Sequence, residues 1–197
     1  MATNIFDSLI VQGVRAGKIP GRTADARSWF RKAAKGVGSV NEHLLLKSDV
    51  SRLTTRPIVG QMYMFGYDPK HKKTLPYYDT LPLIFPVETF KGGFYGINLH
   101  YLPLPLRAKL LDGLYQLANN NKYDETTKLA LSYQMLKGVA KLRWYKPCFK
   151  MYLTGHVRSK FMLVHASEWD IALFLPTARF EKQSATYVQR ESRRSFV

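Results

Sequence analysis

Basic side chains alternate with aromatic rings in residues 126–167, a stretch without a single aspartate or glutamate. Two interpretations are open for it. Lysine and arginine can follow the phosphates of a nucleic acid while neighbouring rings stack on its bases. Equally, the rings can belong to the protein core while the cations lie on its solvated rim. The candidate DNA ligands in this stretch are Lys141, Arg143, Lys146, Lys150, Arg158 and Lys160.

A second group of cations lies in a predicted N-terminal helix, for which Thr23 is a suitable N-cap. The charge of this helix indicates either a solvated face or a basic arm that becomes ordered on a partner chain or on nucleic acid. Its candidate DNA ligands are Arg27, Arg31, Lys32 and Lys35, and its candidate protein contacts are Trp29 and Phe30.

Residue types that could catalyse a reaction are present but form no recognisable motif. The five histidines include no pair at i, i+4, and Cys148 is the single cysteine, so no zinc site is indicated. Asp79, Glu88 and Lys91 are of the types found in metal-dependent nucleases, but their spacing does not match one. We therefore expect no metal, no cofactor and no enzymatic activity, and we expect Cys148 to be a buried structural residue.

The net charge predicts an acidic partner. Thirty lysines and arginines face fourteen aspartates and glutamates, a formal net charge of +16, whereas a magnitude of about 2–8 suits a small soluble domain. Nucleic acid, an anionic membrane or an acidic protein surface could neutralise this charge. No apolar run approaches the roughly 20 residues of a membrane span, and the N-terminus lacks a basic n-region and a cleavage site. DNA or acidic protein is therefore the expected partner, and a membrane is not.

Short strands and helices must position these residues. Apolar, aromatic-rich runs at residues 59–67, 81–87 and 94–102 predict three strands. Gly92 and Gly93 predict a hairpin turn between the last two. After them, Pro105 is placed to begin one helix, and Asp124 is placed to cap a second that runs to about Leu142. A final strand is expected at residues 171–175.

The expected fold class is α+β, with a small antiparallel sheet or partly closed barrel, a packed helix pair, and extended N- and C-terminal arms. A chain of this length can bury one sizeable core. Residues 1–56 would form a helical basic arm and residues 57–176 the α+β core domain. Residues 177–197 would form a basic tail that is ordered only when bound.

A proline-rich span precedes the predicted hairpin. Pro76, Pro82 and Pro86 favour extended backbone and argue against a central hydrogen-bonded strand. Tyr77 and Tyr78 supply the rigid amphipathic contact area that is enriched at protein interfaces. These two tyrosines could either pack in the core or contact a neighbouring protein, and the sequence leaves both interpretations open.

The runs YDPKHKKTLPYYDTLPLIFPVE, GGFYGINLHYLPLPLRAKLLDGLY and EWDIALFLP occur in this order. In sequence and spacing they resemble a family of small basic virion proteins of contractile-tailed bacteriophages, including T-even-like myophages and cyanophages. The resemblance covers about residues 57–180, and some members are described as DNA end protectors. It implies a structural part of the particle near packaged DNA, at the head–tail junction or in the tail and baseplate. It brings no catalytic motif.

Charge and resemblance together predict a non-enzymatic virion assembly protein at the head–tail junction, made in the bacterial host cytoplasm. It would contact packaged DNA without sequence specificity, bind other phage structural proteins, and be present in multiple copies in a symmetric assembly. One alternative is a contractile-tail or baseplate component whose charge meets acidic protein surfaces. The other is a metal-dependent nuclease that processes DNA ends with Asp79, Glu88 and Lys91.

Overall fold

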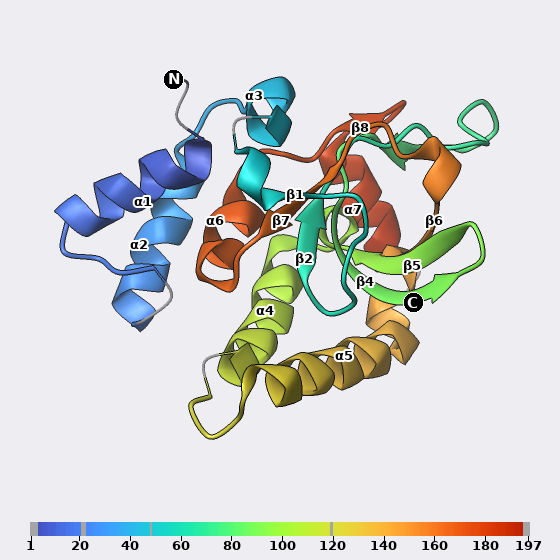
Figure 1. Ribbon diagram of the computed structural model, residues 1–197. Helices are drawn as coiled ribbons and strands as arrows, with labels where there is room; N and C mark the ends of the chain where they lie inside the picture. The colour runs from blue at the N-terminus through green and yellow to red at the C-terminus, as the bar shows by residue number, and fades with distance from the viewer. Residues whose placement is uncertain (1–3, 21–22, 48, 119, 195–197) are drawn as a thin grey trace.

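The computed structural model describes residues 4–20, 23–47, 49–118 and 120–194. Within these residues, a six-stranded antiparallel sheet has the order β1-β7-β2-β4-β5-β6, with helices around it (Figure 1). A separate two-stranded ribbon pairs β3 (Tyr78–Asp79) with β8 (Phe180–Glu181). The larger sheet does not close, because β1 and β6 are its edges. The fold is therefore α+β with an open sheet and no closed barrel. The strands of that sheet are β1 (Leu53–Thr54), β2 (Met62–Met64), β4 (Leu83–Phe90), β5 (Gly93–Asn98), β6 (Phe149–Leu153) and β7 (Phe161–Val164).

The hairpin predicted around Gly92 is confirmed. β4 and β5 pair as far as Phe90 and Gly93, which leaves Lys91 and Gly92 as the turn. Gly92 has a φ of +94°, a conformation that residues with a Cβ rarely adopt. Gly93 meets a different requirement, since a Cβ there would lie 2.3 Å from the carbonyl oxygen of Tyr152 on β6.

The expectation that proline excludes a central strand is wrong at Pro86. This residue lies inside β4, which is flanked by β2 and β5. The register shifts between Pro86 and Glu88, and such a β-bulge tolerates the missing N–H of proline. The carbonyl oxygen of Pro86 accepts a hydrogen bond from the backbone N–H of Gly60 at 3.1 Å. Pro76 and Pro82 do lie outside the strands.

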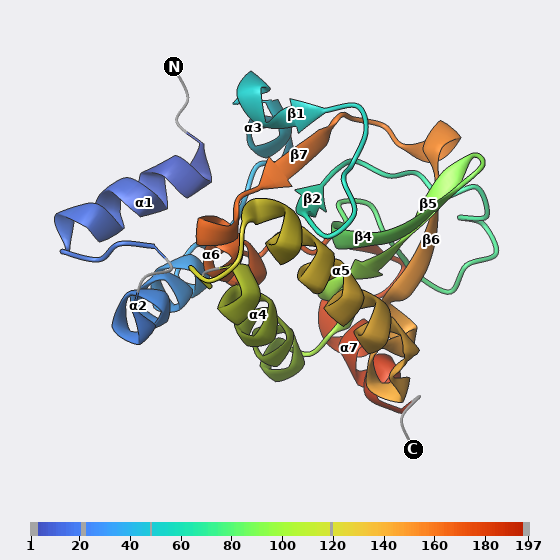
Figure 2. The same ribbon diagram turned by 60° about the horizontal axis from the view of Figure 1, so that its bottom comes forward.

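The predicted helix pair is α4 (Leu104–Ala118) and α5 (Glu125–Lys141). Asp124 caps α5 as expected, because its Oδ1 accepts the backbone N–H of Thr127 at 2.7 Å. The two helices pack on each other, and α5 also contacts β4, so the pair lies along one side of the sheet (Figure 2). The buried leucines of α4 are Leu110, Leu111 and Leu114.

The N-terminal segment forms helices that pack on the rest of the chain. Thr23 caps the second helix as predicted, its Oγ1 accepting the backbone N–H of Ala26 at 3.1 Å. This helix packs on the first and on α6 (Trp169–Phe174). The three helices of the segment are α1 (Ile5–Arg15), α2 (Ala24–Lys35) and α3 (Glu42–Lys47).

Two C-terminal predictions are wrong. Most of the strand expected at residues 171–175 is instead the end of α6, because a short and largely buried apolar run has no periodicity that separates strand from helix. The tail expected to be extended contains β8 and a further helix, α7 (Ala185–Arg194). Val188, which is fully buried, anchors α7. Residues 195–197 of the expected tail lie outside the described residues, and the division of the chain at residues 56 and 176 stays a prediction.

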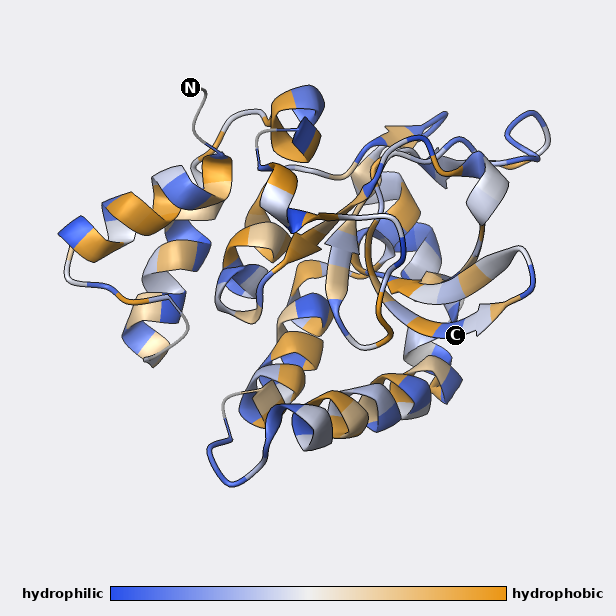
Figure 3. Ribbon diagram, in the orientation of Figure 1, coloured by the Kyte–Doolittle hydropathy of each residue, from blue (hydrophilic) through white to orange (hydrophobic). Residues whose placement is uncertain are grey.

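The core has two parts, one on each face of the sheet. Consecutive residues of β2 alternate between them: Met62 and Met64 join the larger cluster, whereas Tyr63 joins an aromatic cluster. Hydrophobic residues concentrate on β7, α6 and one side of α4, while the α4–α5 connection is hydrophilic (Figure 3). The aromatic cluster comprises Tyr63, Phe65, Tyr67, Ile84, Phe94, Tyr152 and Phe161.

Candidate nucleic-acid interface

Two of the candidate DNA ligands, Arg27 and Arg31 on α2, are held by carboxylates of other helices. The Oδ2 of Asp170 on α6 accepts Nε of Arg27 at 2.8 Å, and its Oδ1 accepts Nε of Arg31 at 2.8 Å. Asp112 on α4 pairs with both guanidinium groups, its Oδ1 lying 3.0 Å from Nη2 of Arg31. We call these four residues the arginine clamp. The clamp joins three helices within the molecule, so Arg27 and Arg31 are engaged by carboxylates of their own chain, and their contact with DNA stays a prediction.

The other residues singled out on α2 divide between surface and core. Lys32 and Lys35 are exposed, and Nζ of Lys35 lies 4.9 Å from the centre of the Phe174 ring. Trp29 is half-buried. Phe30 is 1% exposed, so the expectation that it contacts another protein is corrected: its ring fills the core between α1 and α2.

Rings in residues 126–167 also lie inside the molecule. Tyr145 and Tyr152 are buried. Phe149 stacks on Tyr95 of the neighbouring strand at a ring separation of 5.3 Å. Base stacking on Tyr145 and Tyr152 would require the core to open, and Phe149 is half-buried. Of the two interpretations of this stretch, the structure therefore favours core rings with cations on the rim.

Exposed cations of the C-terminal half gather where α5 ends. Lys137 and Lys141 lie in the last turns of α5, and the 3₁₀ helix η3 (Arg143–Cys148) follows directly. α7 packs against η3, and its C-terminal end lies beside that of α5 in both ribbon views (Figures 1 and 2). We call the surface formed there the basic face. Its exposed residues are Lys137, Lys141, Arg143, Lys146, Arg190, Arg193 and Arg194.

Few carboxylates oppose the charge of the basic face. In the part of the chain that the structure describes, Lys141, Lys146 and Arg193 form no ion pair. Arg194 pairs with Glu191 of its own helix at 3.0 Å, an exposed contact of the kind that contributes little. At 0.1 M salt the field of such charges extends about 10 Å into solvent. The basic face is therefore able to attract phosphates.

Three of the seven residues of the basic face were predicted as DNA ligands from the sequence. The acid-free stretch pointed to Lys141, Arg143 and Lys146, but the arginines of α7 were assigned to an extended tail. The sequence does contain a weak indication of this helix, since Val188 is followed by Ser192 at helical spacing and both residues are buried. With one large apolar residue on that face, the periodicity was too weak to indicate a helix.

Lys150 is predicted as a DNA ligand but does not lie on the basic face. It is half-buried, and its Nζ lies 4.0 Å from the centre of the Tyr101 ring. Burial lowers the pKa of the Lys150 ammonium. The adjacent Cys148 is fully buried, and burial raises the pKa of its thiol to about 12. The prediction of a buried structural cysteine is confirmed.

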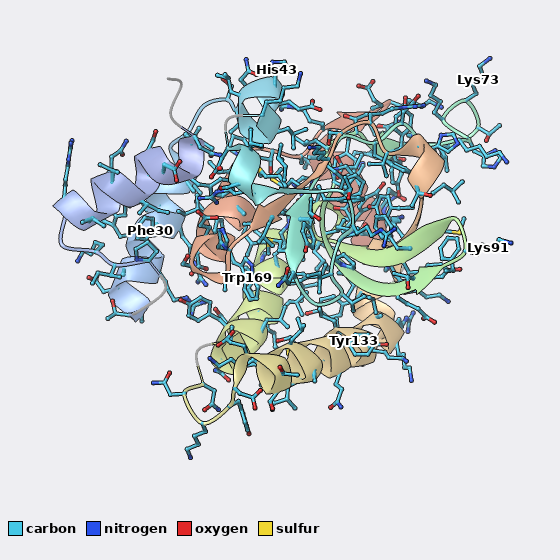
Figure 4. The ribbon with its side chains drawn as sticks, in the orientation of Figure 1. Phe30, His43, Lys73, Lys91, Tyr133 and Trp169 are labelled. Atoms are coloured by element: carbon cyan, nitrogen blue, oxygen red, sulfur yellow. The ribbon has the colours of Figure 1, made fainter. Side chains whose placement is uncertain are left out.

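Arg158 and Lys160 form a third group, before β7. Both are exposed and line an open groove of about 640 Å³ together with His43 of α3. Nη2 of Arg158 lies 3.3 Å from Oδ2 of Asp68. In the view of Figure 4, His43 and Tyr133 of α5 lie at opposite ends of the molecule. The predicted DNA ligands are thus not brought together into one surface.

The residues considered for a nuclease are also separated. Asp79 is 4% exposed, and its Oδ2 accepts Nδ2 of Asn98 at 2.9 Å and lies 2.8 Å from Nδ1 of His100. Glu88 and Lys91 are exposed, with Lys91 at the tip of the β4–β5 hairpin (Figure 4). Asp79 therefore serves a buried hydrogen-bond network. Among the described residues, no group of three or more histidine, cysteine or acidic side chains could hold a metal ion.

A pocket of about 230 Å³ opens between residues 67–79 and β6. Tyr77 and Tyr78, predicted as protein contacts, line it and are half-buried. No local sequence pattern indicates this pocket, because its walls come from segments far apart in the chain. We call it the tyrosine pocket, after Tyr67, Tyr77, Tyr78, Tyr101 and Tyr152.

Comparison with known proteins gives one family. The sequence model of the family described as "Phage T4 terminal DNA protecting protein" matches residues 20–194. No curated protein and no solved structure gives a significant match. Separately, no helix in the described part of the chain is long and apolar enough to cross a membrane. The matched residues include the arginine clamp, the basic face and the tyrosine pocket.

Proposed function

Because the chain belongs to the family of the phage T4 terminal DNA protecting protein, we propose that it binds the ends of linear phage DNA and shields them. The observation that carries this proposal is the basic face, where exposed cations meet few carboxylates. Elsewhere, the arginines of the clamp are neutralised within the molecule. Among the described residues, the exposed cations Lys141, Lys146 and Arg193 of the basic face are thus open to a polyanion.

Binding through the basic face needs no chemistry on the DNA. Lysine and arginine contacts to phosphate position a protein on DNA but carry no sequence information. Each such contact releases condensed counterions, so the logarithm of the affinity falls with log salt by about 0.9 per contact. A protein held in this way at a DNA terminus blocks the access of an exonuclease by occupying the end. The proposed role is therefore structural rather than enzymatic.

We place this activity in the virion, at the head–tail junction, with other phage structural proteins as neighbours. The support is the phage family together with a net charge of +16 that calls for an acidic partner. Half-buried Trp29 and exposed Lys32 and Lys35 on α2 lie apart from the basic face and are available to those neighbours. Several copies around the DNA end would fit a symmetric assembly.

The test compares linear duplex DNA with a closed circle of the same sequence. The purified protein should bind the linear form more tightly and slow its digestion by an exonuclease, and its affinity should fall steeply with salt. The variant Lys141→Ala/Lys146→Ala/Arg193→Ala should lose this protection, with the salt slope smaller by about 3.

The matched control is Lys47→Ala/Lys109→Ala/Lys122→Ala. It removes the same charge from exposed positions outside the basic face and should retain protection. Equal binding to linear and circular DNA, or equal loss in both variants, would contradict the proposal.

A further inference from the structure

The tyrosine pocket has the size and lining of a site for one flat ring system. Its volume is about 230 Å³, below the roughly 300–1,000 Å³ of pockets that hold a whole drug-sized ligand. Tyr77 and Tyr78 line it and are half-buried, and Met151 is 54% exposed at its edge. Aromatic faces stack on any nucleobase, because every base has a π-face.

The charges at the rim of the pocket differ from those at its floor. Lys70 and His71 are exposed and line the opening. Behind it lies the buried carboxylate of Asp79, which accepts from Asn98 and from the backbone N–H of Leu81 at 3.1 Å. Lys150 also lines the pocket, with its Nζ over the Tyr101 ring. The floor therefore carries an anion beside a cation, whereas the rim carries cations alone and suits a phosphate. A base inside, with its backbone phosphate near Lys70, fits both the floor and the rim.

The outer wall of the pocket is held in place before any ligand binds. Nζ of Lys182 donates to the carbonyl oxygens of Lys73 and Leu75, at 3.1 and 2.7 Å. Lys73 lies in the loop at the upper right of Figure 4. At the base of the same loop, Nζ of Lys72 lies 2.9 Å from Oδ1 of Asp68. A wall fixed in this way loses little conformational freedom when a ligand binds.

Side chains of α7 connect the pocket to the basic face. The rings of Tyr77 and Tyr187 meet edge to face, 6.4 Å apart. The guanidinium carbon of Arg190 lies 5.4 Å from the centre of the Tyr187 ring. A DNA strand that follows the basic face along α7 therefore arrives at the pocket.

We infer that the tyrosine pocket holds the base of an unpaired terminal nucleotide, while the basic face binds the phosphates of the adjoining duplex. The inference rests on the proposed function and names the feature by which the site would distinguish an end from the interior of DNA. Taking a base out of a stack is least costly where the base is already unpaired. An overhanging nucleotide is therefore the ligand of choice.

The test uses short duplexes of one sequence with a one-nucleotide overhang, placed on either the 5′ or the 3′ strand. The overhang carries either a thymine or an abasic site. In competition binding, the thymine overhang on one of the two strands should bind about 5- to 140-fold more tightly than its abasic counterpart. Equal binding of thymine and abasic overhangs on both strands would overturn the inference.

Two variants assign the effect to the pocket. Tyr77→Ala should abolish the preference for the thymine overhang, whereas Tyr77→Phe should keep it because the ring remains. If Tyr77→Ala does not fold, Met151→Glu decides, since this exposed position tolerates a charge that blocks the edge of the pocket. A preference that survives Met151→Glu and any folded Tyr77→Ala protein would place the base elsewhere and overturn the inference.

The outcome is separable from that of the proposed function. The pocket variants should still bind a blunt linear duplex through the basic face, and Lys141→Ala/Lys146→Ala/Arg193→Ala should weaken thymine and abasic duplexes alike. Tight binding to linear DNA without discrimination between overhangs would support the proposed function and contradict the inference about the pocket. Equal binding to linear and circular DNA would contradict both the proposed function and the inference.

Discussion

The arginine clamp and the basic face use positive charge in opposite ways. On α2, Arg27 and Arg31 share the carboxylates of Asp112 and Asp170. Arg52 is likewise paired with a carboxylate, since its Nη1 lies 2.5 Å from Oε2 of Glu168. Around the end of α5 and along α7, the exposed cations are met by few acids. The comparison shows that the net charge of +16 is not spread evenly. Carboxylates join the N-terminal helices to the core, whereas the cations of the basic face meet few carboxylates.

The largest effect is expected at the arginine clamp. Asp170→Ala leaves two guanidinium groups without their shared buried partner, which should lower the free energy of unfolding by about 2–4 kcal/mol. The value lies below that of a fully buried pair because the arginine side chains are 19% and 26% exposed. Urea unfolding measures it.

The control for the clamp is Asp25→Ala. Its carboxylate pairs with Lys18 and is 75% exposed, so the loss should stay under about 1 kcal/mol. A small effect of Asp170→Ala, equal to that of Asp25→Ala, would contradict the claim that the arginine clamp stabilises the fold.

A smaller loss is expected in α7. Val188→Ala removes buried methyl groups and should lower the free energy of unfolding by about 1–3 kcal/mol. Because Val188 is the large side chain that anchors α7, the same change should also weaken DNA binding by loosening Arg190 and Arg193. Unfolding and DNA titration of one preparation report both effects. Unchanged DNA affinity in a destabilised protein would show that α7 does not belong to the binding surface.

The smallest effect on stability is expected on the basic face itself. Lys141→Ala removes an exposed side chain with no ion pair among the described residues, so the free energy of unfolding should stay within about 0.5 kcal/mol. The salt slope of DNA binding should nevertheless fall by about 1. Lys109→Ala, exposed on α4, is the matched control and should change neither quantity. A Lys141→Ala protein that loses stability but keeps its salt slope would show that Lys141 stabilises the fold and does not bind DNA.

Local chemistry in the sequence was sufficient for much of the fold. Thr23 and Asp124 marked helix starts because N-capping depends on a residue and the three that follow it. Gly92 marked the hairpin because a tight turn needs positive φ. At residues 171–173 all side chains are buried, so a helix and a strand have the same apolar pattern there. The helix α7 escaped prediction because Val188 is its single buried apolar residue.

The binding surface was harder to predict than the fold. Arg27 pairs with Asp170 across 143 positions and with Asp112 across 85, and no local pattern reports such contacts. Arg27 and Lys141 therefore looked equivalent in the sequence, although one is neutralised and the other is exposed. The tyrosine pocket depends in the same way on the meeting of distant segments.

Lysine acetylation read out by mass spectrometry, with and without saturating linear duplex DNA, tests the central claim most directly. The account predicts that Lys137, Lys141 and Lys146 are protected by DNA while Lys32, Lys47 and Lys109 react at an unchanged rate. Protection of the lysines on α2, α3 and α4, with those at the end of α5 still reactive, would contradict it.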